Sequence, residues 1–259
     1  MHKKKRFGQN FLVDRHYINL ILEAVTPELL DDLVEIGCGD GAITLPLQSQ
    51  CRSLKVIEID KRMVDFLLQK KMIDHAKVEF FNTDVLKIDL KTILDPKCKY
   101  KIIGNLPYNI ATEIIFRLIE CKHLFSLGYI MVQKEVAERL CAQPGSKKFG
   151  KLSIFTQLEV SIDHLFDLPP NVFDPPPKVN STFLKINFDH KNNIHIIDRT
   201  VFSHLVHKCF SMRRKKISTI LKDRLNQKDW ESLNIDSGLR PEDLSIRDYA
   251  SMSNYLKNE

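Results

Sequence analysis

The segment Asn105-Leu106-Pro107-Tyr108 places an amide, a proline and an aromatic ring directly after a run of apolar residues typical of a buried strand. Proline disfavours the helical conformation of the residue before it, so the Leu106 carbonyl is held in an extended segment and aimed outward. Together with the Asn105 side-chain carbonyl, it makes a pair of acceptors suited to the N–H groups of an aromatic amine. Such hydrogen bonds favour a pyramidal nitrogen with a free lone pair, and Tyr108 offers a ring on which a base can stack. The alternative interpretation is an ordinary Asn-x-Pro turn with a half-buried tyrosine.

A second group of residues has the pattern of a nucleoside pocket. Gly37, Gly39 and Gly41 follow an apolar segment, where glycine permits a tight turn and the close approach of a ligand. Glu58 ends the next apolar segment, where a carboxylate can accept hydrogen bonds from both ribose hydroxyls. Asp84 ends the apolar segment after that, where it can accept a hydrogen bond from an adenine amine. Each acid alone is more typical of a solvated strand end. Together the three features predict a nucleoside cofactor.

Alternating strand and helix patterns must position these residues. Apolar segments predict strands at 33–36, 54–59, 78–81, 101–104 and 129–132, and helical spacing predicts helices at 61–73, 111–119 and 134–142. An earlier helix is predicted to begin after Asp14 as its N-cap. This rhythm predicts an α/β fold with a mostly parallel, Rossmann-like sheet whose ligands bind at the carboxyl ends of the strands. Segments 160–165 and 182–188 are expected to add an antiparallel edge.

The pattern changes after the polar segment 189–193. Segments 201–210, 216–225 and 245–256 have the spacing of amphipathic helices. We therefore predict two domains, a catalytic domain at 1–190 and a small all-α domain at 191–259.

Composition and charge restrict the class of protein. The chain has 259 residues, is 43% hydrophobic, and carries 39 Lys and Arg against 33 Asp and Glu, a net charge of +6. The basic residues cluster at 3–6, at Lys147-Lys148 and at Arg213 to Lys216, which suits a polyanionic partner, with solvated basic faces as the alternative. No segment approaches the ~18 apolar residues of a membrane span, and no apolar run follows the basic N-terminus, so we expect a cytoplasmic protein with no membrane partner.

Five segments resemble the KsgA/RsmA family of rRNA adenine dimethyltransferases, in that family's order and over almost the whole chain. They are RFGQNFLVD at 6–14, EIGCGDG at 35–41, GNLPYNIAT at 104–112, MVQKEVAERL at 131–140 and VFDPPPKVNS at 172–181. The resemblance implies a domain that binds S-adenosyl-L-methionine (SAM) and a helical C-terminal domain. It also implies a reaction, the N6,N6-dimethylation of two adjacent adenosines in the 3′-terminal hairpin loop of 16S rRNA, in the small ribosomal subunit or its precursor.

Residue roles carry over by position. Asn10, Leu12, Gly37, Glu58, Asp84 and Asn105 match the family's SAM-binding positions. Leu106, Pro107 and Tyr108 match the target-amine site, and Phe173 matches an aromatic residue facing the flipped adenine opposite Tyr108. The implied mechanism is base flipping between these two rings and direct attack of N6 on the methyl group. Lys147, Lys148, Arg213, Arg214, Lys215 and Lys216 are expected to contact rRNA phosphates.

Other interpretations stay open. A methyltransferase acting on large-subunit rRNA shares much of the Asn-x-Pro-Tyr chemistry, and a ribosome-assembly or transcription factor can keep the fold without catalysis. An NAD oxidoreductase is disfavoured because the spacing is G-x-G-x-G, not G-x-G-x-x-G. We expect a monomer. We also expect no metal site, since His204, His207 and Cys209 are more typical of packing on an amphipathic segment. Cys38 stands where the family usually has proline.

Overall fold

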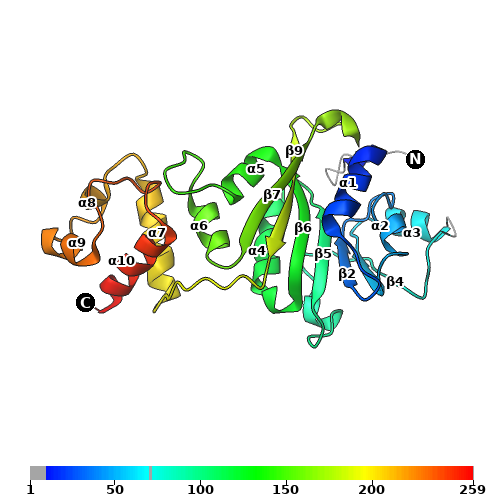
Figure 1. Ribbon diagram of the computed structural model, residues 1–259, viewed down its shortest axis with the longest axis horizontal. Helices are drawn as coiled ribbons and strands as arrows, with labels where there is room; N and C mark the ends of the chain where they lie inside the picture. The colour runs from blue at the N-terminus through cyan, green and yellow to red at the C-terminus, as the bar shows by residue number, and fades with distance from the viewer. Residues whose placement is uncertain (1–9, 70–71, 259) are drawn as a thin grey trace. The chain divides into compact units, whose positions relative to one another are not determined.

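The computed structural model describes residues 10–69 and 72–258, and within them a seven-stranded sheet forms the centre of one unit (Figure 1). Its strands are β2 (Asp32–Ile36), β3 (Ser53–Ile57), β4 (Val78–Phe81), β5 (Tyr100–Asn105), β6 (Phe125–Gln133), β7 (Ser161–Leu168) and β9 (Ser181–Asn187). They lie in the order β4-β3-β2-β5-β6-β9-β7. Neighbours from β4 to β6 pair in parallel, whereas β9 is antiparallel to β6 and to β7. The predicted Rossmann-like sheet with an antiparallel edge is confirmed.

The strand order reverses between β2 and β5. From β2 the chain proceeds outward to β3 and β4, then crosses to the other side of β2 to form β5 and β6. Ile36, the last residue of β2, lies between Ile57 of β3 and Gly104 of β5. Ligands of open α/β sheets bind at such a switch point, beyond the carboxyl ends of the strands.

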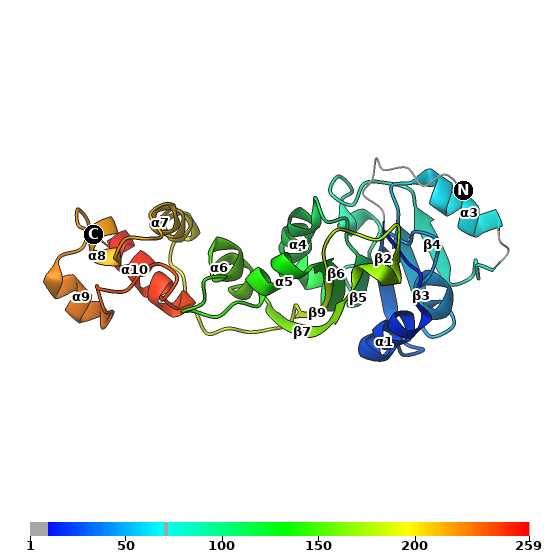
Figure 2. The same cartoon turned by 90° about the horizontal axis from the view of Figure 1, so that it is seen from above.

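Two helices show why the first unit is layered. Figure 2 shows α1 (Arg15–Val25) and α4 (Ala111–Glu120) on opposite faces of the sheet. Asp14 caps α1 as predicted, its Oδ1 accepting hydrogen bonds from the backbone N–H groups of His16 at 2.9 Å and Tyr17 at 3.2 Å. Helix α4 buries one stripe, Ala111, Ile114, Ile115, Leu118 and Ile119. The other helices before residue 141 are α2 (Thr44–Leu47), α3 (Lys61–Gln69) and α5 (Lys134–Leu140), with 3-10 turns at Leu90–Thr92 and Lys122–Leu124.

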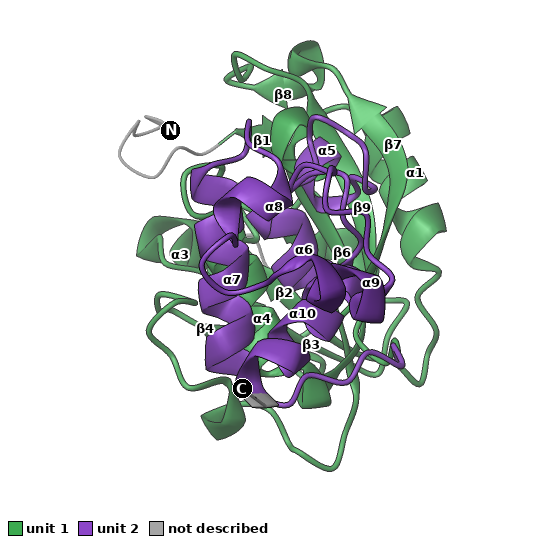
Figure 3. Ribbon diagram, turned by 90° about the vertical axis from the view of Figure 1, so that its left-hand side faces the viewer, with its two compact units in different colours: residues 1–137, 160–190 green, residues 138–159, 191–259 purple. Residues whose placement is uncertain are grey.

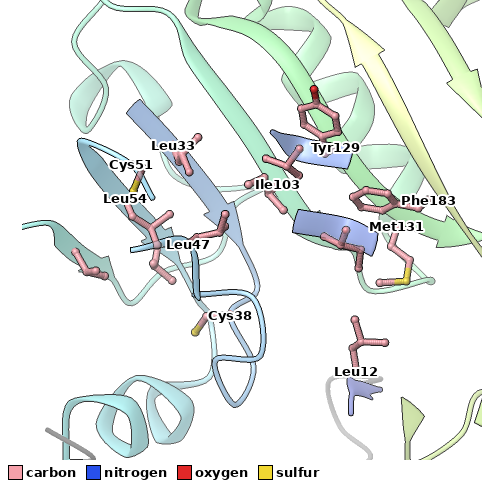
Figure 4. Packing of buried hydrophobic residues seen from close by; sticks show 14 of the residues in the cluster. Leu12, Leu33, Cys38, Leu47, Cys51, Leu54, Ile103, Tyr129, Met131 and Phe183 are labelled. Carbon is pink, nitrogen blue, oxygen red and sulfur yellow. The ribbon is translucent and has the colours of Figure 1, made fainter. Parts of the chain in front are cut away.

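The core behind the switch point is apolar and continuous (Figure 4). Leu33 and Leu54 from neighbouring strands are fully buried. The rings of Tyr129 and Phe183 stack with centroids 6.4 Å apart, which joins β6 to the antiparallel edge. Close packing of this kind resists displacement, so the strand ends form a rigid frame for the loops that follow them.

Two strands escaped prediction because each has only two residues. β1 (Phe11–Leu12) and β8 (Phe173–Asp174) pair antiparallel, with Leu12 opposite Phe173. The Val13 N–H extends the pairing by donating to the Val172 carbonyl at 3.0 Å, and a 3-10 turn at Pro170–Val172 precedes β8. A segment near the start of the described chain is thereby fixed to the segment that carries Phe173.

The second unit is helical and has its own core (Figure 3). Its helices are α6 (Lys151–Gln157), α7 (Arg199–Ser211), α8 (Ile217–Ile220), α9 (Gln227–Leu233) and α10 (Ile246–Asn258). Trp230 and Tyr249 are buried in it, and the Tyr249 hydroxyl donates to the Pro241 carbonyl at 2.9 Å. The predicted helix at 216–225 is wrong in length. Leu221 and Leu225 are buried, as the helical spacing of the segment predicts, but they lie in turns that follow α8 and not in a continued helix.

The units do not follow one cut in the sequence. The first unit contains residues 1–137 and 160–190, and the second contains residues 138–159 and 191–259. Residues 138–159 thus pack with the C-terminal helices, although the sequence placed them in the domain at 1–190. Among the described residues, no helix is long and apolar enough to cross a membrane.

Candidate active site

A cavity lies at the carboxyl ends of β2, β3, β4 and β5. Its wall contains all of the predicted cofactor-binding residues and the Asn-Leu-Pro-Tyr segment, namely Asn10, Leu12, Gly37, Gly39, Glu58, Asp84, Asn105, Leu106, Pro107 and Tyr108. The topology explains this meeting, because parallel strands present their carboxyl ends at one edge. The structure brings these residues together, and their individual roles stay predictions.

The glycine loop after β2 adopts backbone conformations that favour glycine. Gly37 has φ +77° and Gly39 has φ +53°, both in the left-handed region. The Gly37 N–H donates to the Ile57 carbonyl at 2.9 Å, which joins the loop to β3. A Cβ atom at Gly39 would lie 2.9 Å from Cδ1 of Phe11. The missing side chain therefore makes room for Phe11 of β1 against the loop.

Glu58 is held by donors from two segments. Its Oε1 accepts from the Asp60 N–H at 2.8 Å, and its Oε2 accepts from the Gly39 N–H at 3.3 Å. The Cys38 thiol also donates to Oε2 at 3.7 Å. Burial raises the pKa of Glu58, and the hydrogen bonds from Asp60 and Gly39 oppose that rise. The carboxylate is thus fixed in the cavity wall at the position predicted for ribose hydroxyls.

Asp84 lies on the loop after β4, and its carboxylate retains acceptor capacity. Its Oδ1 accepts from the Leu86 N–H at 3.0 Å, and its Oδ2 is 4.0 Å from Lys87 Nζ. The adjacent Thr83 N–H donates to the Glu58 carbonyl at 3.1 Å, so the two acid-bearing loops are joined directly.

The side-chain amide of Asn105 has a defined orientation. Its Nδ2 donates to the backbone carbonyl of Asn10 at 3.0 Å. With the nitrogen committed to that carbonyl, Oδ1 is the amide atom left to accept a hydrogen bond in the cavity. The next residue is anchored as well, because the Leu106 N–H donates to the Met131 carbonyl at 3.1 Å. The described residues provide no hydrogen-bond donor to the Leu106 carbonyl, which leaves it available as the second predicted acceptor.

Tyr108 is half-buried in the cavity wall. Its hydroxyl lies 2.5 Å from Oγ of Ser181, the first residue of β9. Burial raises the pKa of Tyr108, and the hydrogen bond with Ser181 opposes the rise. The phenol therefore stays protonated at neutral pH.

Phe173 is placed differently from the other predicted residues. It does not line the cavity, and with 3% of its surface exposed it packs in the apolar core opposite Leu12. An adenine can stack on Phe173 only after its ring becomes exposed. Its expected role opposite Tyr108 stays a prediction. Without the family resemblance, a phenylalanine at this position is typical of the core or of a loop, and the structure shows it in the core.

The predicted phosphate-binding residues gather in the second unit. Arg213 Nη2 donates to the Lys147 carbonyl at 2.5 Å, which ties the loop of Lys147 and Lys148 to the turn between α7 and α8. Arg213 Nε also donates to Glu242 at 2.9 Å, and Lys148 pairs with Glu138 at 2.8 Å. Lys147, Arg214, Lys215 and Lys216 are exposed. The basic cluster at 3–6 lies outside the described residues.

A family model for ribosomal RNA adenine dimethylase matches residues 1–258. The chain belongs to this family. The ribosomal RNA small subunit methyltransferase A of Saccharophagus degradans is 39% identical over 253 residues, covering 98% of this chain and 94% of that protein. The protein of the same name from Xylella fastidiosa is 38% identical over 252 residues, covering 97% and 95%.

Solved structures support the fold of this rRNA adenine dimethylase. A dimethyladenosine transferase from Plasmodium falciparum matches with a TM-score of 0.79 and 23% identity, covering 96% of this chain and 98% of that one. The 23S rRNA methyltransferase ErmE matches with a TM-score of 0.77 and 21% identity, covering 96% and 100%. At these identities the likeness concerns the fold alone.

The cofactor of this rRNA adenine dimethylase is SAM, and the cavity fits it. SAM carries two positive groups, a sulfonium and an ammonium, besides its ribose and adenine. The cavity wall supplies the carboxyls of Glu35, Glu58 and Asp84 along with apolar side chains. One buried oxygen, Glu35 Oε2, has no hydrogen-bond partner among the described residues, which suits a site that receives a cationic ligand.

The sequence prediction missed Phe11 and Glu35 of the cavity wall. Glu35 is 3% exposed, and burial raises its pKa to about 7. Its signal in the sequence was an acid within the apolar segment 33–36, because such a residue is rarely buried unless it is paired. Phe11 gave no such signal, since its place depends on the pairing of β1 with β8. The described residues contain no metal-binding group of three or more His, Cys, Asp or Glu side chains.

Proposed function

We propose that this rRNA adenine dimethylase transfers two methyl groups from SAM to N6 of each of two adjacent adenosines in small-subunit rRNA, at the 3′-terminal hairpin loop of 16S rRNA. The observation that carries the proposal is the orientation of Asn105, whose amide nitrogen is held by Asn10 so that its oxygen can accept from the target amine. The small-subunit names of relatives 38–39% identical over nearly the full chain support the choice of RNA.

The protein's contribution is position and hydrogen bonding. SAM supplies an electrophilic methyl group on a sulfonium. In the first transfer, the carbonyl oxygens of Asn105 and Leu106 accept from the two N–H groups of N6, which withdraws its lone pair from the ring and directs it toward the methyl group. Each transfer forms the bond from N6 to the methyl carbon as the bond from sulfur to that carbon breaks, and N6 releases one proton to solvent. In the second transfer, the single remaining N–H uses one of the two acceptors. The buried side chain of Leu106, 1% exposed, and its backbone bond to Met131 keep these acceptors in place.

A neutral amide suits this role better than a carboxylate. It accepts a hydrogen bond without attracting a stray cation and without adding a further acid to a cavity that already holds Glu35, Glu58 and Asp84. Tyr108 offers the face on which the extruded base stacks, an interaction worth ~1–3 kcal/mol in single-strand binding.

The second unit supplies the phosphate contacts in this proposal. Lys147, Arg214, Lys215 and Lys216 are exposed, and the bond from Arg213 to the Lys147 carbonyl keeps the loop and the turn adjacent. Contacts to phosphates position an RNA without reading its sequence.

Methylation assays separate the candidate functions. The protein is mixed with labelled SAM and undermethylated small or large ribosomal subunits, and the methyl groups are mapped. Label at two adjacent adenosines near the 3′ end of small-subunit rRNA is the expected result. Label in the large subunit supports the large-subunit alternative. If no RNA is labelled, the proposed enzyme activity is refuted, and the interpretation that remains is an assembly factor that has lost catalysis.

Salt dependence tests the phosphate contacts. The variant Lys215→Gln/Lys216→Gln is expected to weaken rRNA binding and to reduce the slope of log affinity against log salt by about two. Its control is Lys91→Gln/Lys97→Gln, which removes the same charge from exposed positions of the first unit. Equal slopes in the two variants count against the assignment. Arg213 is left in place because it holds Glu242 and the Lys147 carbonyl.

A further inference from the structure

The contact between Tyr108 and Ser181 joins the predicted amine site to a strand far along the chain. The two side-chain oxygens are 2.5 Å apart, although the residues are 73 positions apart in sequence. Tyr108 lines the cavity, whereas Ser181 does not line it and is fully buried, with 0% of its surface exposed. Within the described chain, Ser181 thus contacts the site through the phenol of Tyr108.

Ser181 is held more firmly than Tyr108. As the first residue of β9 it lies opposite Gln133 of β6 on one side and Leu168 of β7 on the other. The carbonyl of the preceding Asn180 accepts from the Lys134 N–H at 2.9 Å. Pairing with strands on both sides restricts the movement of Ser181, so its hydroxyl stays in place when Tyr108 moves.

Tyr108, by contrast, lies in a turn between β5 and α4. Its neighbours Pro107 and Asn109 are not buried, so the turn provides little packing to restrict the ring. A stacked base needs the ring in one orientation, and the hydrogen bond at the far end of the phenol fixes that orientation. Because burial keeps the pKa of the phenol raised, the O–H group persists at the pH of the reaction.

We propose that Ser181 is a positioning residue for adenine methylation, which holds the Tyr108 ring with its face toward the flipped base. This inference rests on the proposed function. It predicts that losing the hydrogen bond slows the transfer step and leaves the binding of SAM unchanged, since Ser181 is outside the cavity wall that receives the cofactor.

The experiment compares four variants of the full chain on undermethylated small subunits. Ser181→Ala and Tyr108→Phe break the bond from opposite ends, and the double variant completes a cycle. The matched control is Thr182→Val. Thr182 is the next residue of β9 and equally buried, but its hydroxyl donates to Asp167 Oδ1 at 2.7 Å and not to the site. Single-turnover rate, KM for SAM and the number of SAM sites are measured for each.

We expect Ser181→Ala and Tyr108→Phe each to lower the rate about tenfold, the effect of one hydrogen bond. The double variant should be no slower than either single variant, and Ser181→Ala should keep the wild-type KM and number of SAM sites. Thr182→Val should keep the wild-type rate.

Three results overturn the proposal: a wild-type rate for Ser181→Ala, losses that multiply in the double variant, or an equal loss for Thr182→Val. Should Ser181→Ala fail to fold, Tyr108→Phe still breaks the bond, and a wild-type rate for that variant refutes the inference. A wild-type protein that methylates no RNA refutes the proposed function instead, so the two failures are distinguishable.

Discussion

Replacing Glu35 by glutamine is expected to stabilise the protein at pH 8 and to leave its stability unchanged at pH 4. Glu35 is buried at the end of β2, and burial raises its pKa to about 7 from an ordinary value of 4.5. Its Oε2 has no hydrogen-bond partner among the described residues. The ionised carboxyl is thus costly in the folded protein, and glutamine has a similar shape without the charge.

The magnitude follows from the difference between folded and unfolded pKa values. Between pH 4.5 and pH 7 the folded state keeps a proton that the unfolded state has released, so stability falls as pH rises through this window. At 1.36 kcal/mol per pKa unit, the difference between about 7 and 4.5 corresponds to about 3 kcal/mol at pH 8. Below pH 4.5 both states are protonated, and the variant gains nothing from losing the charge.

The assay must report on the first unit. Trp230 is the single tryptophan of the chain and lies in the second unit, so its fluorescence is the wrong probe. Hydrogen exchange of the β2 and β5 amides, measured without SAM at several pH values, gives the opening free energy where Glu35 lies. The control is Glu23→Gln, which changes an exposed glutamate on α1.

The pH dependence decides the result. A gain confined to pH above about 5 supports the reasoning, whereas an equal gain at pH 4 and pH 8, or none at pH 8, refutes it. The same substitution should weaken SAM binding at pH 8, because it removes a negative charge from a cavity that receives a cation.

Asn105→Ala should lower the rate of methyl transfer roughly a hundredfold and leave folding intact, as the loss of one hydrogen-bonding group does at other transition states. Single-turnover rates measure the transfer and circular dichroism measures the folding. Normal methylation by the variant contradicts the role of Asn105. Gly39→Ala should weaken SAM binding measured by calorimetry, because its methyl group meets Phe11 at 2.9 Å where φ is +53°; an unchanged affinity counts against that loop geometry. Burial raises the pKa of Asp167, but its hydrogen bonds lower it further, to about 2, and the bond from Lys134 contributes most to this lowering. Lys134→Gln should therefore move this pKa back toward 3.8, measured by NMR of the carboxyl carbon, and an unmoved value refutes the pairing.

Much of the site could be predicted because its residues follow strands. The glycine loop, Glu58, Asp84 and Asn105 each come directly after an apolar segment, and the alternation of strands with helices predicts that those ends share one edge. The local pattern is sufficient here because backbone hydrogen bonding and the burial of apolar runs determine parallel sheets. The same reasoning predicted the antiparallel edge and the Asp14 cap of α1.

Short elements and the ends of helices could not be predicted in this way. A two-residue strand such as β1 has no periodicity to detect, and Leu221 and Leu225 have helical spacing although turns bury them. Residues 138–159 adjoin the first unit in sequence, but they belong to the second unit because their apolar side chains complete its core.

The sequence by itself determined the kinds of chemistry present, an amide acceptor, a stacking ring and acids at strand ends, and where along the chain the strands that carry them lie. Only the tertiary structure decided how they are oriented. Asn10 fixes the Asn105 amide from 95 residues away, and Ser181 fixes the Tyr108 phenol from 73. It also joined Arg213 to the Lys147 loop across 66 residues. These partners are selected by packing between distant segments, and no local pattern of residue types encodes which hydroxyl or carbonyl arrives beside which side chain.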